Sequence, residues 1–136
     1  MEEADEITRR RLALWKLYHE AFAGMEHEGL VRRPIIPPTC QHNAHMYYLL
    51  LPDLERRTAF IGHLKEKGIG AVFHYVPLHS SDAGLRFGRT HGHMTETDAY
   101  SERLVRLPLW LDLTPDLIDA VIEASVEAVM SRSPGR

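Results

Sequence analysis

A strand, a helix and a second strand follow one another so closely that they constrain the fold more than any other feature. The run Met46–Leu51 is apolar on both faces of an extended chain. This predicts a strand over 44–51 that is covered on at least one side, and Pro52 ends it. A helix over 54–67 and a strand over 71–75 come next. At 136 residues, the chain is expected to form one modest domain around this unit.

The helix of this unit has clear signals at both ends. Asp53 is a suitable N-cap, and Gly68 provides the left-handed exit that helices favour. Its inward face is predicted to consist of Leu54, Phe60, Ile61 and Leu64.

The second strand ends in a cluster of polar aromatic side chains. Pro77 removes an amide donor, so the strand must stop near it, and His74, Tyr75 and His79 lie at this exit. Polar groups at such an exit commonly serve a ligand, and a bend at Pro77 would bring these three to one concave surface. The alternative is that they only satisfy backbone groups. The pattern leaves both interpretations open.

The first part of the chain reads as one amphipathic helix over 5–25, followed by a proline-rich linker over 26–43. The helix is expected either to offer its apolar stripe to another domain or second chain, or to pack on its own domain. We predict the former, with self-association as the consequence. The stripe consists of Ile7, Leu14, Trp15, Tyr18, Phe22 and Met25.

The remainder is predicted as a mobile binding loop over 81–97, a short helix over 98–106, a third strand over 107–110 and a final helix that begins at Thr114. Residues 44–131 would form the small domain, and 132–136 a frayed tail. The buried face of the final helix is predicted to be Leu117, Ile118, Val121, Ile122, Ser125 and Val129.

Composition and motifs exclude several classes of function. The net charge is −3 without a basic tract, so no nucleic-acid partner is expected, and no apolar run is long enough for a membrane. The first residues lack the apolar region of a signal peptide, and the single Cys40 fits a reducing, cytoplasmic setting. The pairs His42/His45 and His91/His93 lack zinc spacing, so no metal site is expected. A nucleophilic role for Cys40 has no orienting partner.

Several pieces in a fixed order carry a resemblance to a known family. The chain resembles the C-terminal part of the DegT/DnrJ/EryC1/StrS family of nucleotide-sugar aminotransferases. It is most similar to the branch that makes dTDP-4-amino-4,6-dideoxygalactose for surface polysaccharide. The matching pieces are His42–Tyr48, Ala59–Ile61, His63–Lys65, Ala71–Ser80, Ser101–Leu104 and Arg106–Leu109.

The resemblance implies an α+β fold: a small, mostly antiparallel sheet of about three strands with helices on one face, like the small domain of fold-type-I pyridoxal phosphate (PLP) enzymes. The last strand would lie between the first two and antiparallel to them. The resemblance also implies a dimeric enzyme that moves an amino group, from glutamate, to a nucleotide-linked 4-keto-6-deoxy sugar. His74, Tyr75 and His79 would contact the substrate, and Arg86 and Arg89 would pair with its pyrophosphate.

The resemblance also shows what the chain lacks. Lys16, Lys65 and Lys67 are its lysines, and none stands in a motif like that of the family's cofactor-binding lysine. The chain alone is therefore expected to bind no PLP and to catalyse no transamination. The sequence leaves open whether the chain is a fragment, a truncated product or one part of a split enzyme. Two rival functions also stay open: a non-catalytic dimerisation or sugar-nucleotide-binding module, and a His-rich metal binder.

Overall fold

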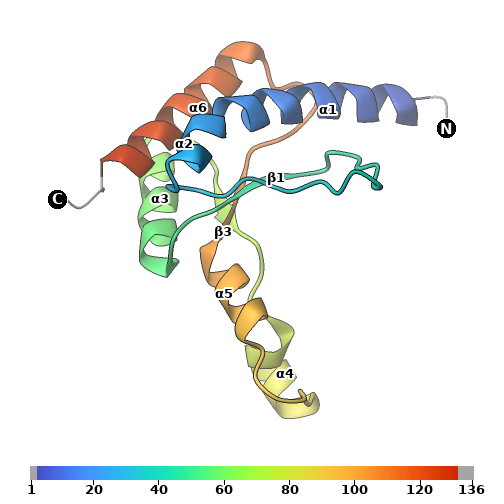
Figure 1. Ribbon diagram of the computed structural model, residues 1–136, viewed down its shortest axis with the longest axis vertical. Coiled ribbons are helices and arrows are strands. Elements are labelled where there is room, and N and C mark those ends of the chain that lie inside the picture. The colour runs from blue at the N-terminus through green and yellow to red at the C-terminus, as the bar shows by residue number, and fades with distance from the viewer. Residues whose placement is uncertain (1–2, 132–136) are drawn as a thin grey trace.

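The computed structural model describes residues 3–131, so the predicted tail at 132–136 lies outside the described residues. Figure 1 shows helices and a small sheet gathered into one part, from which a segment between the second and third strands projects. We call residues 74–103 the arm and the rest of the described chain the body.

Three short strands form the sheet. They are β1 (Tyr47–Leu50), β2 (Val72–Phe73) and β3 (Leu104–Leu107), in the order β1-β3-β2. Both pairs are antiparallel. The predicted α+β fold and the central, antiparallel position of the last strand are therefore confirmed. The predicted position of β3 at 107–110 is wrong, because Pro108 cannot donate to the ladder and the strand ends before it.

Two helices begin and end as predicted. In α3 (Leu54–Glu66), Asp53 accepts a hydrogen bond from the Arg56 amide at 2.7 Å, and Gly68 follows with φ of 76°. In α6 (Pro115–Met130), Thr114 caps the first turn. The residues predicted to face inward on both helices are buried or partly buried, except for one residue in the first turn of each helix. Those exceptions are Leu54, which is 44% exposed, and Leu117, which is 49% exposed.

The first helix is divided. Helix α1 (Ala4–Ala21) and helix α2 (Ala23–His27) are separated at Phe22, where φ is −88° and ψ is 5°. The prediction of one continuous helix over 5–25 is therefore wrong at this residue. The Phe22 side chain is fully buried, and the change of direction carries α2 past the end of the sheet (Figure 1).

The apolar stripe of α1 is buried in the body itself. Trp15, Tyr18 and Phe22 join the core that Tyr47 forms with α3 and α6, and Tyr18 Oη donates to the Pro108 carbonyl at 2.9 Å. Burying each such side chain is worth about 1.5–3 kcal/mol. The prediction that the first helix exposes this stripe or gives it to a partner is therefore wrong. Self-association, or contact with a missing large domain, through the first helix stays a prediction.

The arm has more regular structure than predicted. It contains the short 3-10 helix η1 (Leu78–Ser80), α4 (Asp82–Phe87) and α5 (Thr95–Arg103). The expectation of an irregular loop over 81–97 is wrong because Ser81 caps α4, accepting a hydrogen bond from the Gly84 amide at 3.0 Å. No residue of the arm is buried, although its helices are well formed.

Candidate functional site

The base of the arm is fastened by polar contacts. Within it, His79 Nε2 lies 2.8 Å from Asp98 Oδ1, which joins η1 to α5. Contacts with the body hold α5 in the same way. They are Arg57 Nη1 to the Ser101 carbonyl at 2.8 Å, Arg103 Nε to the Leu51 carbonyl at 2.8 Å, and Arg32 Nη1 to Tyr100 Oη at 3.2 Å. The arm thus has a defined direction without a core of its own.

His74 and Tyr75 meet in a hollow at the base of the arm. Their rings contact each other edge to face, with centroids 4.6 Å apart. The hollow measures about 480 Å³, and α5 closes its far side with Glu96 and Tyr100. These two predicted site residues are therefore brought together on one concave surface.

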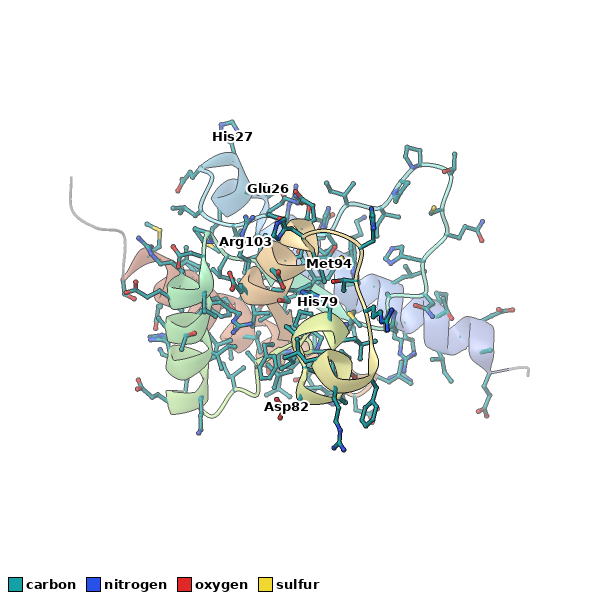
Figure 2. All side chains as sticks on the ribbon, turned by 90° about the horizontal axis from the view of Figure 1, so that it is seen from below. Glu26, His27, His79, Asp82, Met94 and Arg103 are labelled. Atoms are coloured by element: carbon teal, nitrogen blue, oxygen red, sulfur yellow. The ribbon has the colours of Figure 1, made fainter. Side chains whose placement is uncertain are left out.

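His79 lines a neighbouring hollow of about 540 Å³. Arg89 and Met94 line the same hollow, and Leu78 and Thr97 separate it from the first. The predicted single surface for three aromatic residues is thus divided in two. The physical reason is the contact with Asp98, which turns the His79 ring toward α5. Figure 2, seen from below, shows His79 and Met94 on the arm.

The predicted arginines take different positions. Arg89 lines the hollow of His79, whereas Arg86 lies over the ring of Phe87, with its guanidinium carbon 4.9 Å from the centroid. Both side chains are exposed, so each is accessible to a ligand. Their predicted pairing with pyrophosphate stays a prediction.

Arg106 is the site residue that sequence reasoning missed. Its guanidinium carbon lies 5.7 Å from the centroid of the Tyr75 ring, beside His74. Burial lowers the pKa of His74, and the charges of Arg106 and His45 lower it further. Arg106 was missed because a helix was expected over 98–106, whereas Leu104–Leu107 forms a strand with alternating partly buried and buried positions.

The three lysines do not fit a PLP site. Lys16 is exposed, and its Nζ lies 3.5 Å from Oε1 of Glu20. Lys67 forms a salt bridge with Glu127. Lys65 is exposed near the end of α3. A lysine that binds this cofactor must lose its proton near neutral pH, which needs an enclosed or cation-flanked position. A carboxylate partner favours the protonated amine instead.

Within residues 3–131, no group of three or more His, Cys, Asp or Glu side chains comes together in a way that would hold a metal ion. None of the described helices is long and apolar enough to cross a membrane.

The helices and the small three-stranded antiparallel sheet match the small domain of the aminotransferase fold. The chain matches the DegT/DnrJ/EryC1/StrS aminotransferase family over residues 1–126 and belongs to that family.

Individual relatives agree in fold. The chain is 31% identical over 138 aligned positions to the uncharacterized protein MJ1066 of Methanocaldococcus jannaschii, covering 98% of this chain and 34% of the relative. S. venezuelae DesV is 26% identical, with a TM-score of 0.80 over 93% of this chain and 33% of DesV. NtdA of Bacillus subtilis, solved with bound PMP, is 20% identical, with a TM-score of 0.81 over 91% of this chain and 28% of NtdA. The chain thus spans about a third of the length of these relatives.

Proposed function

We propose that this chain is the C-terminal portion of a PLP-dependent aminotransferase for a nucleotide-linked 4-keto-6-deoxy sugar. The product would be of the dTDP-4-amino-4,6-dideoxygalactose type, used in surface polysaccharide. The family match supports the aminotransferase class. The sugar branch rests on the resemblance of residues 71–80 and 101–109 to that branch.

The observation that carries the proposal is the pair of adjoining hollows at the base of the arm. His74 and Tyr75 line one, and His79 and Arg89 line the other. Together they offer aromatic faces and hydrogen-bonding groups for a sugar and base, and a cation for a pyrophosphate. In this proposal the chain orients the substrate, and the other two thirds of a full-length relative supply the lysine and the phosphate cradle.

The matching experiment is a titration of the 136-residue chain with thymidine diphosphate, followed by NMR. We expect saturable shifts confined to residues of the arm. Arg89→Gln should weaken binding about tenfold, as expected for the loss of a charge-assisted contact to phosphate. His27→Ala, on exposed α2, is the matched control and should bind like the unaltered chain. Shifts outside the arm, or equal binding by Arg89→Gln, would contradict the proposal.

A second function is favoured by the position of the lysines. Because all three are exposed or paired with carboxylates, the chain by itself would act as a sugar-nucleotide-binding or dimerisation module. Adding PLP, glutamate and a nucleotide-linked keto sugar should then yield no amino sugar and only random lysine labelling. A stoichiometric lysine adduct that one Lys→Ala change abolishes, together with turnover, would disprove this.

A further inference from the structure

The sheet has a second face, opposite the core, on which basic side chains gather. The register places Tyr48 and Val72 on either side of Arg106. Side chains opposite one another in paired strands share a face, so these three point away from the face that buries Tyr47 and Val105. This second face is partly open, since Val72 is 46% exposed.

Two side-chain nitrogens on this side of the sheet have no partner among the described residues. Nδ1 of His74 and Nε of Arg106 are both shielded from solvent, and neither makes a hydrogen bond within the described chain. A shielded polar nitrogen without a partner loses its hydrogen bonds to water without replacement, so such groups are normally satisfied. The Tyr75 ring beside the guanidinium limits where Arg106 can turn. Nε–H of Arg106 thus has no acceptor among the described residues, and Nδ1 of His74 has no partner there.

Arg106 and His45 are the charged groups that act on His74. His45 lies close enough for its charge to act on His74, and its own Nδ1 is held by Asn43 Oδ1 at 3.0 Å, which leaves Nε2 for another contact. Arg106 takes part in no salt bridge of the described residues. Glu96 of α5 lines the hollow of His74, and its side chain is exposed to solvent.

We propose that Arg106, His74 and His45 form a binding site for an oxyanion, a carboxylate or phosphate group of a ligand. The guanidinium fork would donate hydrogen bonds to two oxygens side by side, with Nε–H as one donor, and a His74 ring protonated at Nδ1 would donate a further one. His45 adds charge at the edge of the site. An anion there would satisfy both shielded nitrogens and offset the crowding of like charges.

This site extends the proposed substrate site and rests on the proposed function in that respect, because His74 also lines one of the two hollows. The two proposals are tested at different arginines, Arg89 in the hollow of His79 and Arg106 on β3. Failure of the thymidine diphosphate titration at Arg89 can therefore be told from failure of the small-anion titration at Arg106.

The experiment follows the Arg106 Nε–H signal and the His74 ring by NMR in the unaltered 136-residue chain. Inorganic phosphate and glutarate are the two probes, and chloride at equal ionic strength is the control. We expect a saturable shift of Arg106 Nε–H with at least one probe. The same probe should raise the pKa of His74, since a bound anion favours the charged imidazole. Phosphate alone, glutarate alone or both would support the site and identify which oxyanion it accepts.

Variants provide the second measurement. Arg106→Gln should weaken binding at least about tenfold, the loss expected for one charge-assisted hydrogen bond. Arg106→Lys should restore part of it, because it keeps the charge but not the fork. Arg56→Gln on α3 is the matched control and should leave binding unchanged. No saturable shift with either probe in the unaltered chain, or equal binding by Arg106→Gln, would overturn the proposal.

Discussion

In the body, Tyr18, Phe22 and Tyr47 are completely shielded from water, whereas no residue of the arm is buried. The body is held by apolar contact between α1, α3, α6 and one face of the sheet. The arm is held by hydrogen bonds at its base, such as that between His79 and Asp98. Apolar burial is the larger contribution to stability, so the body should fold without help from the arm.

This difference between body and arm indicates where residues can be substituted without unfolding the protein. Phe87 and Leu85 are large apolar residues of the arm that remain 78% and 71% exposed. Such residues contribute little to the stability of an isolated domain, yet exposed apolar groups are typical of binding surfaces. Function in this chain is therefore expected to reside in the arm and in the strands that carry it.

The largest expected effect compares one phenylalanine from each region. Phe22→Ala removes a fully buried ring and should lower the free energy of unfolding by about 3–5 kcal/mol. Phe87→Ala should change it by no more than about 0.5 kcal/mol. Denaturant unfolding followed by circular dichroism measures both. Similar losses in the two variants would mean that the arm is part of the cooperative unit.

A smaller effect compares two helix caps. Asp53→Ala removes the cap of α3 in the body and should cost about 1 kcal/mol of global stability. Ser81→Ala removes the cap of α4 in the arm. It should leave global unfolding unchanged and speed amide exchange in α4 alone, because that helix opens locally. A global loss equal to that of Asp53→Ala would contradict the separation.

The smallest expected effect is a loss of folding stability at acidic pH, to which one histidine from each region contributes. Burial, then the Arg33 charge, lowers the pKa of His19, whose ring stacks on Trp15 in the body. His74 at the base of the arm also has a lowered pKa, from burial and then Arg106. An unfolded histidine takes up its proton near about pH 6.5, before the folded one does. Stability should therefore be complete above that pH and decrease as the pH falls toward the folded values.

Replacing each histidine separates the two contributions. His19→Gln should reduce the acid dependence of global unfolding, whereas His74→Gln should mainly reduce the acid dependence of opening at the base of the arm. Unfolding curves at a series of pH values, with amide exchange at the same values, provide the measurement. A free energy of unfolding that increases as the pH falls would contradict the lowered pKa values of His19 and His74.

Sequence reasoning succeeded where one local signal decides the structure. Asp53 and Thr114 predict where two helices begin, Gly68 predicts where one ends, and the structure confirms all three. It failed where long-range packing decides. Phe22 divides the first helix because its ring belongs to the core, which no local pattern of α1 reveals.

The candidate site was predicted in part for the same reason. His74 and Tyr75 are adjacent in sequence, so their meeting in one hollow followed from the strand exit alone. Arg106 joins them only because β3 lies between the other two strands, and its neighbour across the ladder is 58 positions away at Tyr48. The contact with Asp98 directs the His79 side chain toward α5, and sequence spacing does not predict this contact across the arm.

The strand order has a consequence for how the protein is made. β1 and β2 are not neighbours in the sheet, and the strand that each pairs with is β3, which is the last of the three to be synthesised. Until residue 107 is available, the apolar edge of Tyr47–Leu50 has no strand partner. Sheet formation must therefore wait for the whole arm to be synthesised, and such non-local pairing folds slowly. Early helix formation by α1 and α3 would shelter the nascent core during that interval.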